Sequence, residues 1–596
     1  MKLLRLKITD PKGFRSLPCG FEHHFRTEWN LDDELAQASD FAPFVCAGPN
    51  GSGKSNLLEA LAAIFFQLEV LRVRRSFLPE ALQDEALDVS PVAFELDYLI
   101  RVPAEYRSPD SPLWARVAAW KNAGESVRFH WGNQNDFSID AYDAFKGGHA
   151  DILLPQYVLG YSSGENEILS LPFFKMRFVQ FDEYWNALTR QLSYPGHPET
   201  RLAYLDSGFS QAILLCNLLF QDEATLQPFR EDVGIEALRE FRIILRRSIE
   251  LRPEQLAAFA SEDESTRQSL EDIVKGNPAL HAATDELGNT QYRLNLLQLL
   301  EGDEKSSLLV SALKRCATLR YVDDASDALV LDYWVNEATR QAFRENFDGS
   351  ALVLFQAFQV LLTLNLCAVS EVLKTDLYTS TSHYVSETVP TLASDQRIMR
   401  FKFVRFTKQG AAQPMMLKEL SDGEHQLLHS LGLCLLFRET NSLFLLDEPE
   451  THFNPDWRAN FISRLRQCLP GNGEFAQEML ITTHTPFLIS DSKPEKVLVF
   501  AKDKTSGKVR ISQPPYNTLG ASINKITMNT FGKRETIGGH AQALLEALRA
   551  RFEHGTEDKE ALITEIHQQL GDSVEKVLLI KAILDAERPS NGEGQG

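Results

Sequence analysis

A glycine-rich turn near the start of the chain has the residue types and spacing of a phosphate-binding loop. The string GPNGSGKS, residues 48–55, follows an apolar run and precedes a helix-like segment, the context that such a loop requires. Its glycines free backbone N–H groups to face phosphate oxygens, and the following helix directs its positive end at them. We expect Lys54 to reach the β- and γ-phosphates of ATP and Ser55 to ligate Mg²⁺. The predicted nucleotide-binding residues are Gly48, Asn50, Gly51, Ser52, Gly53, Lys54, Ser55 and Asn56.

Two acidic residues and a histidine far downstream are suited to phosphoryl transfer. The string SLFLLDEPE is an apolar run that ends in Asp447 and Glu448, so a strand would deliver two adjacent carboxylates to the edge of a sheet. Asp447 is expected to hold the Mg²⁺ shell, and Glu448 to polarise the attacking water. A further run, EMLITTH, ends at His484, placed to sense the γ-phosphate. The predicted catalytic residues are Glu448, His484 and Lys54, and the predicted metal ligands are Ser55 and Asp447.

A polar string before an amphipathic segment offers a second set of phosphate-binding groups. LSDGEHQ, residues 420–426, places a hydroxyl at Ser421 and a closely approachable backbone at Gly423 on the N-terminus of a helix. The predicted nucleotide-binding residues of this string are Ser421, Gly423 and Glu424. An ordinary helix cap formed by Ser421 and Glu424 explains the same residues.

The order of these strings resembles that of a known group of ATPases. GPNGSGKS, LSDGEHQ, LFLLDEP with ETHFNP, and ITTHTP together resemble the ABC-type heads of SMC, RecF and overcoming-lysogenization-defect proteins. The matching segments are residues 1–65 and 415–500. Asp422 departs from the Gly of transporters. Residues 453–455, FNP, stand where relatives often have Leu-His-Pro, which leaves the cross-subunit contact open.

The resemblance implies a site shared between two subunits. ATP would lie between Lys54 of one subunit and Ser421 of another, so the chain is expected to self-associate as a dimer or a higher assembly. Arg15 would approach the nucleotide, and an exposed surface arginine is the alternative. Such heads also have a glutamine lid that senses Mg²⁺. Its candidates here are Gln156, Asn166 and Gln180, and the sequence does not choose among them.

The length of 596 residues exceeds what one hydrophobic core usually organises. We expect the α/β fold class, with an ABC-type ATPase head and a mostly helical inserted lid. Prolines in the insertion rule out a long coiled-coil arm. The predicted parts are residues 1–184, the P-loop lobe; 185–395, the lid; 396–530, the rest of the head; and 531–596, helices near 538–552 and 572–587 with a disordered tail.

Composition narrows the class of protein and its partners. The net charge of −21 excludes a nucleic-acid coat over the whole chain, although a local basic groove can still bind DNA. Basic residues gather in VLRVRRSF, LREFRIILRRS and RFKFVRFTK. Each cluster is explained either by a solvent-exposed face or by a DNA-binding surface. The last string is typical of a strand.

Cysteines and apolar runs indicate a cytoplasmic protein. Seven cysteines are scattered without the spacing of a zinc site or a disulfide framework. The most apolar stretch, residues 351–373, contains Gln356, Gln359 and Asn365, so a buried helix is expected and no membrane contact.

The layout as a whole resembles the ATPase subunits of bacterial anti-phage and restriction-associated systems such as Septu, PARIS and retron-linked ATPases. That resemblance implies a separate nuclease or toxin effector under the control of this chain. No DxD carboxylate set follows His484, so we expect no nuclease activity from this chain alone. A RecF-like, ATP-dependent DNA-binding repair protein is the alternative.

Overall fold

The computed structural model describes most of the chain. The described residues are 1–27, 31, 41–84, 86–109, 111–137, 150–163, 167–194, 199–260, 269–284, 290–382, 384–389, 391–469, 475–503, 505–532, 537–555 and 558–585. Asn166 and the predicted C-terminal tail after residue 585 lie outside them.

A seven-stranded sheet forms the centre of the molecule, with strand order β20-β19-β3-β18-β17-β7-β8. All neighbouring pairs from β19 to β8 are parallel, and β20 alone joins antiparallel. The inner strands are continuous apolar runs because helices cover both faces. The strands are β3 (Phe44–Ala47), β7 (Tyr157–Ser162), β8 (Leu202–Tyr204), β17 (Ser442–Asp447), β18 (Glu478–Thr483), β19 (Val497–Lys502) and β20 (Val509–Ser512).

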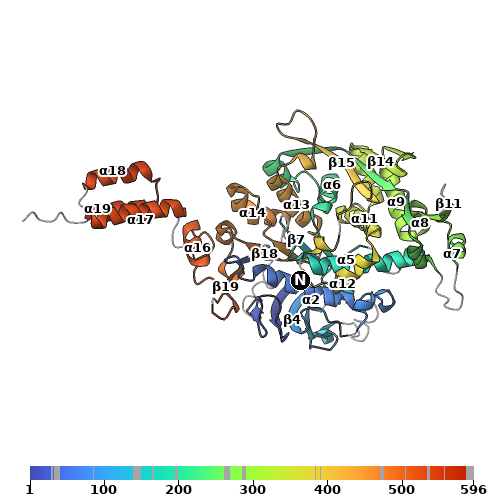
Figure 1. Cartoon of the computed structure of the whole chain (residues 1–596), viewed down its shortest axis with the longest axis horizontal. Coiled ribbons are helices and arrows are strands. Elements are labelled where there is room, and N and C mark those ends of the chain that lie inside the picture. Colours follow the sequence, from blue (N-terminus) through green and yellow to red (C-terminus); the bar gives the residue numbers. More distant parts are fainter. Residues whose placement is uncertain are drawn as a thin grey trace, which may run out of the picture.

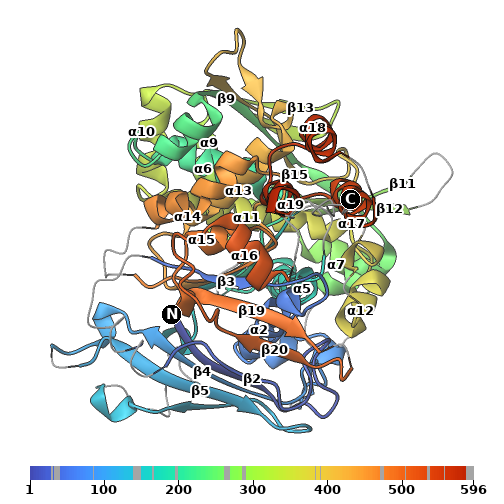
Figure 2. The same ribbon diagram turned by 90° about the vertical axis from the view of Figure 1, so that its left-hand side faces the viewer.

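The two faces of this sheet belong to two separate hydrophobic cores. Successive residues of a strand point to opposite faces, so Val45 lies in one core and Cys46 in the other. The helices α2 (Lys54–Val70) and α5 (Ser170–Thr189) share the core of Cys46, although the end of α5 reaches the other core. The helices α6 (Ser210–Phe220), α13 (Asp422–Leu436) and α14 (Pro455–Cys468) share the core of Val45. In both views α13 and α14 therefore lie above the sheet and α2 below it (Figures 1 and 2).

An antiparallel sheet of order β2-β1-β4-β5-β6 extends the core around α2. It lies at the bottom of Figure 2, next to β19 and β20. β1 and β2 pair antiparallel at the N-terminus, and Arg15 lies in the turn between them with φ 54°. The elements are β1 (Lys2–Ile8), β2 (Glu22–His24), β4 (Phe94–Arg101), β5 (Trp114–Lys121), β6 (Arg128–Trp131) and the short helix α4 (Ala150–Leu153).

The inserted region contains helices and also two sheets that the sequence did not predict. A five-stranded sheet has the order β13-β14-β9-β15-β16, and a small one the order β10-β12-β11. Helices cover the first sheet, and α11 packs on α6 and β15. The helices are α7 (Leu270–Gly276), α8 (Leu296–Gly302), α9 (Glu304–Cys316), α10 (Glu337–Asn346), α11 (Ala351–Thr363) and α12 (Glu371–Thr379). The strands are β9 (Ile235–Arg246), β10 (Ser248–Leu251), β11 (Leu280–Thr284), β12 (Thr290–Asn295), β13 (Leu319–Asp323), β14 (Ala328–Trp334), β15 (Met399–Lys408) and β16 (Met415–Met416).

The expected limits of the lid fall inside structural units. Residue 185 lies within α5, and residue 395 separates β14 and β9 from β15, which belong to one sheet. The reason is visible in β9, whose buried residues alternate with half-exposed ones such as Arg242 and Arg246. The sequence showed these arginines as a basic cluster, whereas the strand pairs with partners more than 80 residues away.

One region, Ala351–Ala368, is long and apolar enough to cross a membrane by length and composition alone. Its apolar window is 61% buried inside the protein, and Leu354, Phe355 and Phe358 are completely buried. The polar residues within it are used in the fold, since the Gln359 amide donates to the carbonyl of Thr200 at 3.0 Å. This region is the buried helix that the sequence indicated.

The C-terminal segment ends in a three-helix unit with its own small core. It follows β20 and α16 and lies apart from the main body at the left of Figure 1. Helices α17 and α19 correspond to the two predicted helices, but α18 was missed; Asp558 caps its N-terminus, and Leu562 and Ile566 bury its apolar face. The three helices of the unit are α17 (Gly539–His554), α18 (Lys559–Gln569) and α19 (Val574–Asp585). They follow α15 (Pro486–Ser490) and α16 (Ile523–Thr530) in the chain.

Candidate functional site

The phosphate-binding loop connects β3 to α2 at the carboxyl edge of the central sheet. Gly48 has φ 148°, and a Cβ there would lie 2.4 Å from the carbonyl oxygen of Phe500 in β19. Gly53 has φ 99°, and a Cβ there would lie 2.8 Å from the hydroxyl of Ser16. A side chain at either position would push the loop away from its neighbours, so both glycines are required by packing as well as by backbone conformation.

Lys54 begins α2 and is almost fully buried. Its ammonium donates to the carbonyl oxygens of Gly48 at 3.1 Å and Pro49 at 3.2 Å, and lies 3.1 Å from Nε2 of His484. Burial lowers the pKa of Lys54, while the nearby carboxylates of Glu448 and Asp447 oppose that shift. The structure therefore holds one cation inside the loop, next to the end of β18.

Ser55 and Asp447 are in direct contact, although they lie 392 residues apart in the sequence. The Ser55 hydroxyl donates to Oδ1 of Asp447 at 2.7 Å, and the Thr482 hydroxyl donates to the same oxygen at 2.6 Å. Burial raises the pKa of Asp447, and the two hydroxyls oppose that shift. A hydroxyl and a carboxylate in contact at the end of the loop are the hard oxygen donors that Mg²⁺ prefers, so these residues fit the expected metal.

Glu448 follows β17 in a strained conformation. Its φ is 49°, which places a non-glycine residue in the left-handed region at a cost of about 1 kcal/mol. Its N–H donates to the Thr482 hydroxyl at 3.0 Å, and its Oε1 lies 2.9 Å from Nε2 of His484. The hydrogen bond from His484 lowers the pKa of Glu448, and burial opposes this. Both side chains are about one third exposed, at 33% and 35%, so the pair faces outward from the sheet edge.

His484 has two competing partners for a single nitrogen. Its Nε2 can accept a hydrogen bond from Lys54 or, when protonated, donate one to Glu448, but one tautomer cannot do both. The histidine thus lies between the cation of the loop and the carboxylate of β17. Thr482 was missed in the sequence, where two threonines immediately before His484 were the available signal.

The structure places Ser421 on the other side of the sheet. Ser421 caps α13 and forms a capping box with Glu424, whose carboxylate also pairs with Lys408 of β15. Gly423 allows the first turn of α13 to approach the segment after β17, since a Cβ there would lie 2.7 Å from the His452 carbonyl. Both sequence interpretations remain compatible with this geometry, because the cap is present and α13 packs on the face of the sheet opposite to α2.

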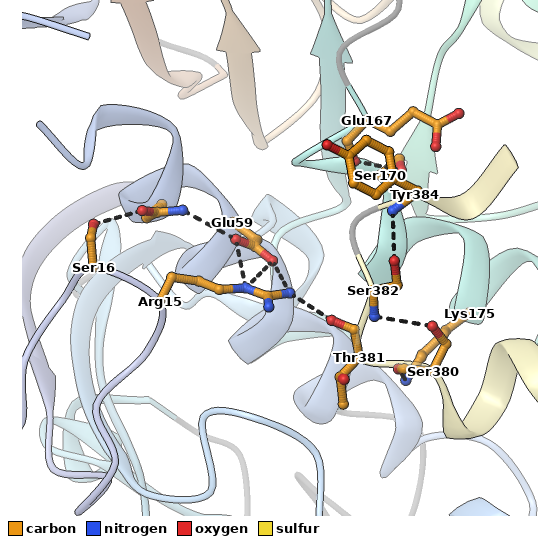
Figure 3. A network of polar contacts seen from close by, with 11 residues as sticks. Arg15, Ser16, Glu59, Glu167, Ser170, Lys175, Ser380, Thr381, Ser382 and Tyr384 are labelled. Atoms are coloured by element: carbon orange, nitrogen blue, oxygen red, sulfur yellow. Dashed lines mark hydrogen bonds and ion pairs between the residues drawn. The ribbon is translucent and has the colours of Figure 1, made fainter. Parts of the chain in front are cut away.

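Arg15 forms hydrogen bonds within the chain (Figure 3), and so does Asn56. The Arg15 guanidinium donates to Glu59 in α2 at 3.0 and 2.9 Å and to the carbonyl of Thr381 at 3.1 Å. Oδ1 of Asn56 accepts from the Ser16 hydroxyl at 2.6 Å. Arg15 is therefore neither a free surface arginine nor in contact with the loop itself, and it ties α2 to the segment after α12.

The structure gives the positions of two of the three candidates for a glutamine lid. β7 runs parallel to β17 with Ser162 opposite Asp447, so Gln156 lies at the far, amino edge, where its amide binds the backbone of Asn441. Gln156 therefore cannot serve as the lid. Gln180 lies in α5, about 15 Å along the helix from Ser170. Asn166 belongs to the segment directly after β7 but is outside the described residues.

Several arginines of the basic clusters pair with neighbouring acids. Arg242 pairs with Asp332 at 2.5 Å, Arg405 pairs with Glu240 at 2.5 Å, and Arg72 pairs with Glu69 at 3.1 Å. The third cluster forms β15, as its alternating pattern predicted. These ion pairs reduce the positive charge that the clusters offer to a phosphate backbone.

Comparisons with known proteins agree with the class of this site. The profile of the family described as "AAA domain, putative AbiEii toxin, Type IV TA system" matches residues 236–490, less than half of the chain but including Ser421, Asp447, Glu448 and His484. No curated protein matches the chain in sequence.

Two solved structures are similar to the chain over 86% of its length. One is the SMC head domain from Thermotoga maritima, with 12% identity, 99% of that chain covered and a TM-score of 0.26. The other is an SmcHead bound to the C-winged helix domain of ScpA, with 10% identity, 96% covered and a TM-score of 0.29. TM-scores this low do not support an assignment of fold or function. The strand order, the loop geometry and the family match support an ABC/SMC-type P-loop ATPase head.

Proposed function

We propose that the chain binds ATP with Mg²⁺ and hydrolyses it to ADP and phosphate. The observation that carries this proposal is the meeting of five side chains at one edge of the sheet, from three segments distant in sequence. They are Lys54, Ser55, Asp447, Glu448 and His484. Each has the chemistry that one part of phosphoryl transfer needs.

The residues divide the reaction among them. Lys54 and the backbone of the loop bind the β- and γ-phosphates. Ser55 and Asp447 would hold Mg²⁺, which would supply positive charge to neutralise the phosphate oxygens. Glu448 orients a water for attack on the γ-phosphorus and accepts its proton as the bond to the β–γ bridging oxygen breaks. When phosphate draws Lys54 away, Nε2 of His484 is left to donate to Glu448 or to the γ-phosphate.

We further propose that Ser421 of a second copy completes the site. Three observations support this. α13 packs on the opposite face of the sheet from α2, the Glu448–His484 pair faces outward, and helix N-termini favour phosphate. ATP would then join two subunits, and hydrolysis would release them.

The biological role that we propose is that of a sensor or regulatory subunit in a bacterial anti-phage defence system. In this role the ATP state of the pair controls a separate nuclease or toxin effector. The toxin–antitoxin description of the matching family and the absence of a DxD carboxylate set after His484 in the sequence support it. A RecF-like DNA-binding role competes with it, and the ion pairs of Arg242 and Arg405 weigh against that role.

Two measurements test these proposals. Phosphate release is first compared among wild type, Glu448→Gln and Glu439→Gln, the same chemical change at an exposed position before β17. Only Glu448→Gln should stop turnover. Tagged Glu448→Gln protein, trapped with ATP, is then purified from its host and its partners are identified by mass spectrometry. A stoichiometric nuclease or toxin supports the defence role, whereas DNA with repair factors supports the alternative.

A further inference from the structure

A third acidic residue, Glu450, lies beneath the exposed pair of Glu448 and His484. It is 3% exposed and belongs to the turn after β17. Its Oε1 accepts a hydrogen bond from the hydroxyl of Thr483, which is completely buried at the end of β18. The Thr483 hydroxyl in turn accepts the N–H of Thr485 at 3.0 Å. A single carboxyl group is therefore connected to the residues on both sides of His484.

The adjacent threonines of β18 reach different acids. Thr482 binds Asp447 and the N–H of Glu448, as described above, and Thr483 binds Glu450. The turns that follow β17 and β18 are thus joined at separate points below the Glu448–His484 contact. Because that contact is one third exposed, its own hydrogen bond is weakened by water, and the buried bonds beneath it set the position of the two side chains.

The turn that carries Glu450 is itself anchored. The Glu450 carbonyl accepts from the N–H of Phe453 at 3.0 Å and from Nε of Arg458 at 3.3 Å. The next residue, Thr451, binds the Ser163 hydroxyl at 2.9 Å, and the N–H of His452 donates to Gln426 in α13 at 2.9 Å. The position of Glu450 is therefore fixed by β7, α13 and α14, and Thr483 has a rigid partner.

Burial of the Glu450 carboxyl group is destabilising, and its hydrogen bonds offset this only in part. Within the described part of the chain, its Oε2 is buried with no hydrogen-bond partner. Burial raises the pKa of Glu450 to about 7, with the Thr483 hydroxyl opposing; the charged groups that influence it are Glu448 and Arg458. An apolar residue would fill this place at lower cost, which indicates a function for the carboxyl group.

We propose that Glu450 is a positioning residue of the ATPase site: through Thr483 it fixes the turn that carries His484, so that the imidazole meets Glu448. It touches neither nucleotide nor metal in this role. The role concerns the hydrolysis step and so rests on the function proposed above, whereas the geometric part of it concerns the folded chain alone.

The first experiment removes one hydroxyl at a time. Thr483→Val deletes the donor to Glu450 with little change in volume, and Thr483→Ser keeps it. Thr440→Val is the matched control: Thr440 is also buried, its hydroxyl donates to the Phe437 carbonyl at 2.6 Å, and it precedes β17 at the opposite edge of the sheet. We expect Thr483→Val to lower kcat about 10-fold or more with KM for ATP unchanged within about twofold, and Thr483→Ser and Thr440→Val to stay near wild type.

The second experiment follows His484 without ATP. The 14 histidines are labelled with ¹³C at Cε1, and the His484 resonance is assigned by its loss in His484→Gln. Thr483→Val and Glu450→Ala should shift this resonance, and Thr440→Val should leave it unchanged. Thermal unfolding of each variant shows that it is folded.

The His484 resonance and the kcat distinguish failure of the positioning role from failure of the proposed ATPase function. A His484 resonance that does not move overturns the positioning role whatever happens to kcat, and so does a moved resonance with an unchanged kcat in an active enzyme. If wild-type protein releases no phosphate, the proposed function fails, and the resonance alone then decides whether Glu450 positions His484.

Discussion

The two predicted phosphate-binding regions differ in how far one chain completes them. Around Lys54, hydrogen bonds from β3, β17 and β18 converge, and Ser55 already touches Asp447. Around Ser421, the polar groups are satisfied locally, by Glu424 and through it by Lys408. One region is therefore assembled from distant segments of the chain, and the other is an intact helix end whose polar groups bond to nearby residues.

This difference shows why the two regions carry different strain. Glu448, with positive φ, and the tight glycines Gly48 and Gly53 all belong to the region around the loop. Strain of this kind persists only where surrounding contacts over-determine the backbone. The helix end at Ser421 has ordinary dihedral angles, which is what a preformed docking group for a second subunit requires.

The largest expected effects come from the assembled region. Lys54→Ala should abolish both ATP binding and hydrolysis, because no other cation takes the place of the ammonium within the loop. Glu448→Gln should lower phosphate release by about 100-fold or more while ATP binding persists, since it removes only the group that orients water. Phosphate release and equilibrium dialysis with labelled ATP measure the two effects. Loss of binding in Glu448→Gln would contradict the assignment of its role.

The next effect tests whether the regions belong to different subunits. Lys54→Ala and Ser421→Ala should each be inactive as homodimers. Mixed at equal amounts, they form heterodimers in which one site has both Lys54 and Ser421, so part of the activity should return. If each site were formed within one chain, the mixture would stay inactive. Wild type mixed with Lys54→Ala serves as the control for subunit exchange.

The sequence predicted the strained region better than the surrounding lobes, for a physical reason. The loop and the end of β17 depend on local strings such as GPNGSGKS and LLDEPE, whose residue types follow directly from phosphate and metal chemistry. Glu450 and Thr482 were accessible in the same strings, but their roles depend on which strands are neighbours. That β17 and β18 are adjacent and in register, with Asp447 opposite Thr482, is not written in either string.

The lid was predicted less well because its sheet is built from distant strands. β9 pairs with β14 and β15, and its outward arginines find acids on those partners, as Arg242 does with Asp332. From the sequence the same arginines suggested a basic surface. The alternation in RFKFVRFTK was long enough to predict a strand.

A smaller effect is expected on the pH dependence of the free energy of unfolding, measured without ATP, because Glu450 is buried in the assembled region. The pKa of Glu450 is about 7 in the folded chain, against a usual value of 4.5. Between these values the unfolded chain has released a proton that the folded chain keeps, so the free energy of unfolding falls as pH rises through this window. Glu450→Gln lacks this dependence. Its stability relative to wild type should therefore increase by about 3 kcal/mol from about pH 4.5 to above pH 7.

Urea unfolding at the two pH values measures the change, and Glu439→Gln, whose side chain is 68% exposed, provides the control. A pH-independent difference between wild type and Glu450→Gln would mean that Glu450 ionises normally and that its carboxylate is charged beneath the site.

The smallest effect concerns Arg15, which decides where the assembled region ends. If Arg15 serves to hold α2, Arg15→Ala should lower the free energy of unfolding by about 1 kcal/mol, because it removes a partner of the buried Glu59 carboxylate, which is 2% exposed. Adding Glu59→Gln should recover part of that loss, since the buried negative charge disappears. ATP affinity should change by about threefold or less. An affinity loss of about tenfold with unchanged stability would instead make Arg15 a nucleotide ligand, and the assembled region would then extend from the sheet edge to the turn between β1 and β2.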